Sequence, residues 1–246
     1  MKQRWSDYAL LVAGLLVLWQ VAYYVVGAEA LTPPLETARR LAALVAADGF
    51  WSHARATGIA FLYASVLALG GGLVMGIAIG SSTMAHEILS PILGTLYSIP
   101  KIMLYPVILL IFGLGLTAKV AFGAIHGFFP VVLFTIGAIR NLPPVMLRTG
   151  RVLQLSWPSL VGHIYLPACL PEIFTGLRIG FSTTLLGTLI GELFASSEGL
   201  GFLLSRAMES HNVPDIMALT LLLFLIATGA NTIILAVESR LQAHAT

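Results

Sequence analysis

Three ionisable residues lie within long apolar stretches of the sequence: Lys101, His126 and Glu192. They are isolated from one another along the chain, whereas enzymatic chemistry needs a nucleophile, a base or metal ligands gathered at one place. The six histidines are scattered, Cys169 is the only cysteine, and no G-x-x-x-x-G-K-[ST] phosphate loop occurs. The sequence therefore predicts that this chain holds no cofactor or metal and binds no ATP itself, and it disfavours a membrane-embedded enzyme.

Lys101 follows a proline inside one of these apolar stretches. Pro100 and Pro106 each remove a backbone hydrogen bond, and carbonyls freed in this way are tolerated in lipid only against protein or a water-filled cavity. A charge near mid-membrane costs at least ~2.5–3.5 kcal/mol on insertion scales. Two interpretations stay open: a kinked helix whose lysine snorkels or pairs with a carbonyl, or a helix break on a solute path, where Lys101 attracts an anion.

Glu192 shares its apolar stretch with Arg178, at a separation of ~21 Å along a helix, so the two cannot pair within it. Each lies near one end of the stretch, which favours anchoring at the membrane interface. The functional alternative places Glu192 on the solute path together with Pro100 and Lys101. His126 is interpreted as a packed, hydrogen-bonded residue rather than a ligand.

The other polar residues of interest gather in residues 141–171, a proline-rich loop between two apolar stretches. Long ordered loops are usually functional. Asn141 and Ser156 can each cap a short helix, which predicts a rigid helix–turn–helix on the cytoplasmic face. The corner at residues 154–156 between these helices, with Trp157 beside it, predicts a docking surface for a cytoplasmic partner.

Composition supplies the setting for these residues. The chain has 246 residues, 58% hydrophobic and 10% charged, whereas soluble domains carry about 25% charged residues. A net charge of +2 without a basic run gives no support for nucleic-acid binding. Stretches of about 20 apolar residues can span a bilayer. Six qualify: 8–26, 55–80, 88–111, 119–139, 173–195 and 216–237.

These spans predict one all-α membrane domain over residues 1–246, with both termini on the same side. Lysine and arginine are modestly enriched on the side of the termini and the 141–171 loop, so we expect that side to be cytoplasmic. Residues 35–47 predict a short interfacial helix on the outer side. Glycines four residues apart predict close helix packing at 72/76/80, 123/127, 176/180 and 187/191.

The 141–171 loop resembles the cytoplasmic loop of binding-protein-dependent ABC importer permeases, whose pattern is E-A-A-x3-G-x9-I-x-L-P. The matching positions are Arg148-Thr149-Gly150, Gln154, Ile164, Leu166 and Pro167. Further pieces resemble the nitrate/sulfonate/taurine/bicarbonate branch of that family. They are Leu31-Thr32-Pro33-Pro34, Ile99-Pro100, Phe112-Gly113-Leu114-Gly115, Phe128-Phe129-Pro130, Gly191-Glu192 and Ser196-Ser197-Glu198-Gly199-Leu200-Gly201.

The loop departs from the family pattern at residues 148 and 154. Arg148 stands where the family has glutamate, which implies a changed contact with the partner. Gln154 stands where the family has glycine, and it fits poorly if the turn needs a positive φ. A compensating acid on the partner, a second permease with the usual motif, and an uncoupled relic are the three explanations left open.

The resemblance implies a type I importer permease in the inner membrane, a homodimer or heterodimer with a second permease copy. Each permease would dock through its loop onto a separate ATPase subunit that binds ATP and magnesium. The contact surface implied for the loop comprises Arg148, Thr149, Gly150, Arg151, Gln154, Leu155, Ser156 and Trp157. A periplasmic or lipid-anchored solute-binding protein would deliver a small, anionic nutrient. The rival from another class is an ion-coupled secondary transporter, with Lys101 and Glu192 as coupling charges.

Overall fold

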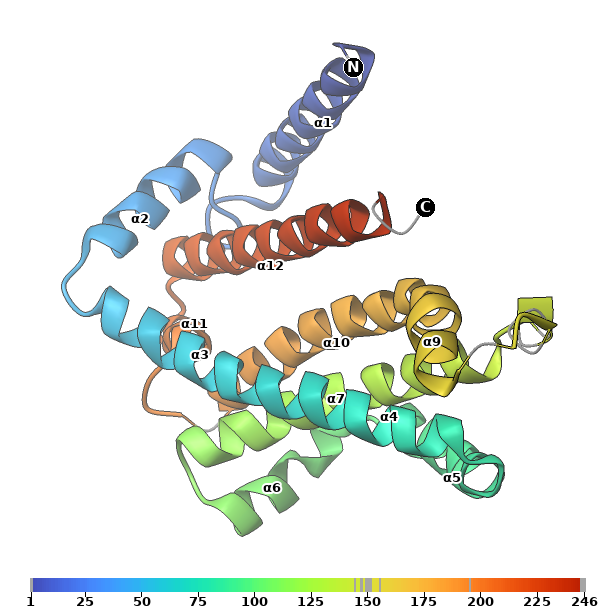
Figure 1. Cartoon of the computed structure of the whole chain (residues 1–246). Coiled ribbons are helices and arrows are strands. Elements are labelled where there is room, and N and C mark those ends of the chain that lie inside the picture. The colour runs from blue at the N-terminus through green and yellow to red at the C-terminus, as the bar shows by residue number, and fades with distance from the viewer. Residues whose placement is uncertain are drawn as a thin grey trace.

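The computed structural model describes residues 2–143, 145, 146, 148, 152–154, 156–194 and 196–243, and all regular structure in this part is helical (Figure 1). The helices are α1 (Lys2–Val26), α2 (Pro34–Ala46), α3 (Phe50–Ser65), α4 (Gly71–Ser81), α5 (Thr83–Ser98), α6 (Tyr105–Phe112), α7 (Leu116–Arg140), α9 (Trp157–Leu160), α10 (Leu166–Phe194), α11 (Leu200–Glu209) and α12 (Val213–Ala243). π-Helical turns occupy Val66–Gly70 and Val161–Tyr165, and a 3₁₀ turn occupies Lys101–Leu104. The expected all-α class is confirmed.

Helix α7 is the centre of the molecule, packed between α4 and α10. On the α4 side, a Cβ added at Gly76 would lie 2.5 Å from the Thr135 Cβ and 3.1 Å from the Val132 carbonyl oxygen. On the α10 side, a Cβ at Gly127 would lie 2.6 Å from the carbonyl oxygen of Gly180. Backbones this close leave room only for hydrogen, so the predicted small-residue packing is confirmed.

Five helical segments among the described residues are long and apolar enough to cross a membrane, or six if one bent pair counts as a span. The pair consists of Thr83–Ser98 and Lys101–Phe112, bent by 89°. The bend falls at Ile99 and Pro100, where the sequence predicted an interruption. The expected span 88–111 starts too late, because the Ser82 hydroxyl accepts from the Ala85 amide and α5 begins at Thr83.

The chain also becomes helical earlier after the loop than the sequence indicated. Helix α9, the π turn Val161–Tyr165 and α10 follow one another without a gap, and Pro171 lies inside α10. The expected span 173–195 therefore begins too late as well, since α10 starts at Leu166. Pro167 cannot donate to the carbonyl of residue 163, and the π turn directly before it accommodates this break in the hydrogen-bond ladder.

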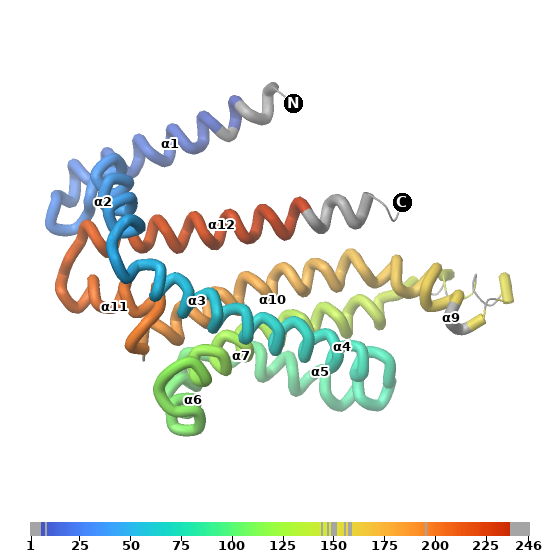
Figure 2. Tube along the Cα trace, turned by 60° about the vertical axis from the view of Figure 1, so that its left-hand side comes forward, coloured from blue at the N-terminus to red at the C-terminus, as the bar shows by residue number. Residues whose placement is uncertain are grey.

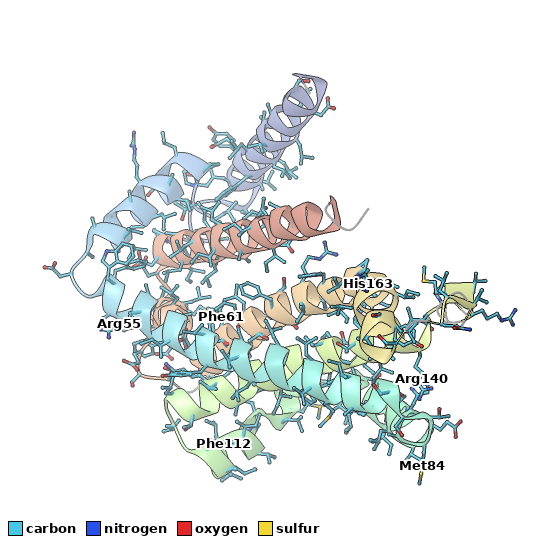
Figure 3. All side chains as sticks on the ribbon, in the orientation of Figure 1. Arg55, Phe61, Met84, Phe112, Arg140 and His163 are labelled. Atoms are coloured by element: carbon cyan, nitrogen blue, oxygen red, sulfur yellow. The ribbon has the colours of Figure 1, made fainter. Side chains whose placement is uncertain are left out.

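The ends of the molecule are distinct. In Figures 1 and 2, α9 and the ends marked N and C lie on one side, and α2 and α11 lie on the opposite side. Figure 3 places Arg140 and Met84 at the first end and Arg55 at the second. The end with α9 is the loop end, and the end with α2 and α11 is the far end. Helix α10 connects them.

Helices α1 and α2 form the periphery. The apolar window Ala9–Val26 of α1 has none of its residues buried by the rest of the chain. Helix α2 packs on α12, and the Arg40 guanidinium binds both carboxylate oxygens of Asp215 at the start of α12. The hydrogen bond to Asp215 raises the pKa of Arg40 above its ordinary value, against a smaller opposing effect of burial.

Candidate functional site

The loop end carries the predicted contact surface. Arg148 is helical and exposed, and Ser156 is exposed, with its hydroxyl 3.0 Å from that of Ser159. Trp157 begins α9, although its side chain is outside the described part. Thr149, Gly150, Arg151 and Leu155 also lie outside the described residues.

Gln154 adopts a φ of +51°. This is the left-handed region, where a side chain costs a non-glycine residue roughly 1 kcal/mol or more. The turn therefore needs the backbone conformation for which glycine is suited, as the departure from the family pattern led us to expect. The loop keeps this turn with a glutamine in it.

Three apolar side chains of the loop are largely exposed. Their exposed fractions are Val145 69%, Val152 80% and Leu153 61%. Exposed apolar groups next to polar ones mark interaction surfaces. Because these residues follow α7 and precede α10, a partner bound here would hold both central helices at one end.

Lys101 lies at the break between α5 and α6. Its Nζ donates to the Tyr97 carbonyl at 3.0 Å and lies 4.4 Å from the centre of the Tyr97 ring. The Phe129 ring is also close, at 5.7 Å. Carbonyl pairing, the first interpretation from the sequence, is thus present in the structure.

The same lysine lines a groove of about 490 Å³ between α5, α7 and the π turn Val66–Gly70. A second groove of about 600 Å³ shares Leu67, Ala124 and Ile125 with the first and continues towards Phe112. Exposed Pro100 begins the 3₁₀ turn next to the first groove. The broken helix therefore borders grooves with almost entirely apolar walls, and Lys101 places one cation on the first of them.

His126 is packed and hydrogen-bonded, as predicted. Its Nδ1 lies 2.8 Å from the Phe122 carbonyl oxygen, and its ring contacts that of Phe122 edge-on. Because a carbonyl can only accept, Nδ1 carries the hydrogen. The ring also fills the space beside Gly187, where a Cβ would lie 2.8 Å away.

Glu192 lies at the far end in an environment the sequence did not indicate. Its side chain is fully buried, so the expectation of interfacial anchoring is wrong. One carboxylate oxygen accepts from the Thr57 hydroxyl at 2.7 Å and from the Gly201 amide at 3.0 Å. The other lies 3.7 Å from Nζ of Lys119, which is equally buried.

Sequence reasoning missed Thr57 and Lys119 as members of this network. Lys119 was expected only as the residue that opens the span 119–139 on the outer side, yet it is 1% exposed. The sequence did show that Lys119 and Glu192 each lie near the end of an apolar span. It could not show that the two residues meet, because they lie on different helices.

Solved structures resemble the fold. The chain is similar to a chain of the MetNI methionine ABC transporter, solved in inward facing conformations, with a TM-score of 0.59 and 19% identity. The match covers 80% of this chain and 94% of that one. At this level of identity the likeness concerns the architecture alone.

Relatives with curated descriptions match over most of their length. A probable ABC transporter permease protein of Haemophilus influenzae is 30% identical over 91% of each chain. The putative aliphatic sulfonates transport permease protein SsuC of Bacillus subtilis is 29% identical over 87% of this chain and 78% of its own. The taurine transport system permease protein TauC of Escherichia coli is 30% identical over 79% and 73%.

The family comparison covers the same region. The family described as "Binding-protein-dependent transport system inner membrane component" matches residues 68–244. That range contains the interrupted span, the loop and the central helices α7 and α10. The chain therefore belongs to the family of binding-protein-dependent inner membrane transport components.

Proposed function

We propose that this chain is the membrane-spanning permease subunit of an ATP-driven importer for a small anionic nutrient. The observation that carries the proposal is the family match over residues 68–244. It favours an importer permease over the ion-coupled secondary transporter. The chain forms the solute path in the inner membrane, and ATP with magnesium is bound and hydrolysed by a separate subunit.

The loop end is the docking site for that ATPase, on the cytoplasmic side together with both termini. The exposed turn around Gln154, with Arg148 on one side and Ser156 and Trp157 on the other, meets the partner. Thr149, Gly150, Arg151 and Leu155 complete the contact as the resemblance implies. A nucleotide-driven displacement of this surface reaches the membrane through α10.

The groove beside Lys101 is our candidate for the solute path, completed by a second permease copy. Pro100 interrupts the helix there, and Lys101 supplies a positive charge within otherwise apolar walls. The sulfonate and taurine named for two relatives are small anions or carry an anionic group, as do the nitrate and bicarbonate of others. Glu192 supports the path at its far end, where a solute-binding protein delivers the cargo.

The first test is to express the tagged chain in its native host, extract it gently and identify every co-purifying protein by mass spectrometry. An ATPase at one copy per permease, without a second permease, supports a homodimer and makes Arg148 a rewired contact. An ATPase with a second permease supports a heterodimer. Absence of any ATPase, with transport persisting after ATP depletion, overturns the proposal.

A further inference from the structure

The far end contains a buried polar network that ties four elements to one another. We infer that Thr57, Lys119 and Glu192 are positioning residues that make α11 move with α10 during transport. The inference rests on the proposed function, because it assigns a route for the displacement that an ATPase would produce at the loop end.

Glu192 and Thr57 form the inner part of the network. Thr57 on α3 donates its hydroxyl hydrogen to Glu192 on α10 at 2.7 Å, and the same hydroxyl accepts from the Leu200 amide at 2.8 Å. The Gly201 amide donates to the same carboxylate oxygen of Glu192 at 3.0 Å. The first turn of α11 is thus held by side chains of two different spans.

Lys119 and His53 hold the segment just before α11. Nζ of Lys119, in the first turn of α7, donates to the Glu198 carbonyl at 2.6 Å. Nδ1 of His53 on α3 accepts from the Gly199 amide at 3.1 Å. Four successive residues, 198–201, therefore each give a backbone group to a side chain of α3, α7 or α10.

The packing allows α11 little independent movement. A Cβ added at Gly201 would lie 2.5 Å from the Leu189 carbonyl oxygen and 2.7 Å from the Glu192 Cβ, so the backbones of α10 and α11 touch. Thr57 is 5% exposed, Lys119 1% and Glu192 0%. Water cannot replace these hydrogen bonds unless the contact opens.

Helix α10 links this network to the loop end. It has 29 residues, or ~43 Å at 1.5 Å per residue, and it continues the π turn and α9. Because a helix is stiff along its axis, displacement of its loop end displaces Glu192. The network then carries that displacement to α11, which has no covalent route to the loop except through α10.

A purely static contact would not need charges here. Buried ion pairs are commonly replaceable by apolar residues without loss of stability, so their presence points to a requirement for one defined geometry. The carboxylate oxygen of Glu192 that faces Lys119 has no hydrogen-bond partner in the described part of the chain. Lys119 instead donates its hydrogen bond to the Glu198 carbonyl, and this contact holds residues 198–201 in place.

The test uses the intact complex with its ATPase subunits and three variants. Thr57→Val removes the hydroxyl but keeps the shape, and Thr57→Ser keeps the hydroxyl. Thr135→Val is the control, because the buried Thr135 hydroxyl has no hydrogen-bond partner among the described residues. An environment-sensitive fluorophore is attached to Met208→Cys, an exposed position of α11, in a Cys169→Ala background.

Emission is compared before and after trapping with ATP and vanadate. We expect a shift in the parent complex, in Thr57→Ser and in Thr135→Val, and its loss in Thr57→Val with the same amount of trapped ADP. An equal shift in Thr57→Val, or no shift in the parent complex, overturns the inference. If Thr57→Val does not assemble, Lys119→Gln replaces it with the same outcomes. A parent complex that traps no ADP contradicts the proposed function instead.

Discussion

Lys101 lines an apolar groove, and its ammonium group donates a hydrogen bond to the Tyr97 carbonyl. Its carbonyl bond and ring contacts explain how the charge is tolerated within a membrane span, and its place on the groove leaves donors for a passing anion. Gln154 is the second residue whose local setting matters, because its backbone conformation suits glycine. Each leads to a prediction at the scale of one side chain.

Replacing Lys101 by Met removes the charge while retaining most of the length and apolar surface of the side chain. If the groove carries an anion, Lys101→Met weakens stimulation of ATP hydrolysis by the transported solute, and Lys101→Arg preserves it. The measurement is ATPase activity of the reconstituted complex with and without solute-loaded binding protein. Unchanged stimulation in Lys101→Met would count against a role in the path.

Replacing Gln154 by Gly should relieve the positive φ and stabilise the turn by roughly 1 kcal/mol. The expected result is slower proteolysis of the loop in the purified complex. His211→Gly is the matched variant at the far end, since His211 also has a φ of +51°. It should leave loop proteolysis unchanged, and equal protection by both variants would show that the effect is not local.

At the scale of elements, α7 depends on glycines of its neighbours. Gly76→Ala places a methyl group against Thr135 and should destabilise the α4–α7 pair by ~1–3 kcal/mol, as overpacking does. Gly58→Ala is the control on the same continuous span, because nothing lies within 4 Å of an added Cβ there. Thermal unfolding of the two variants in one detergent measures the difference, and equal midpoints would contradict the packing described.

The elements also show what the sequence could and could not predict. Hydropathy predicted the helices, Pro100 predicted the break, and the four-residue spacing of glycines predicted the helix contacts. These features depend on local composition and spacing. The expected span 88–111 begins after the actual start of α5, because apolar composition marks the span whereas the polar Ser82 caps the helix. The Glu192 network could not be predicted, because Thr57 and Lys119 reach it only after α3, α7 and α10 have packed.

At the scale of the whole molecule, the Arg40–Asp215 pair fastens the peripheral α2 to α12 and so to the remainder of the chain. The folded-state pKa of Arg40 is raised above the ordinary value of an arginine. Any stability that this residue contributes is therefore complete below the ordinary pKa and is lost only as the pH rises through the still higher folded value. Between about pH 6 and pH 9 the arginine itself therefore introduces no pH dependence.

We expect Arg40→Gln to loosen α2, seen as faster hydrogen exchange of residues 34–46, by the same factor at both ends of that pH range. Arg39→Gln, one residue away on the same helix, is the control. An effect of Arg40→Gln that grew or vanished across this range would show that another group governs the contact.

The π turn Val66–Gly70 has a consequence for changes in chain length. In an α-helix, removal of one residue rotates everything beyond it by about 100°. A deletion between Gly72 and Gly76 would thus turn one of these glycines away from α7. A π turn holds one extra residue, so a deletion within Val66–Gly70 can be absorbed by conversion to an ordinary α turn. Homologues one residue shorter here would keep the same face of α4 against α7, so the span would tolerate a one-residue deletion at this turn.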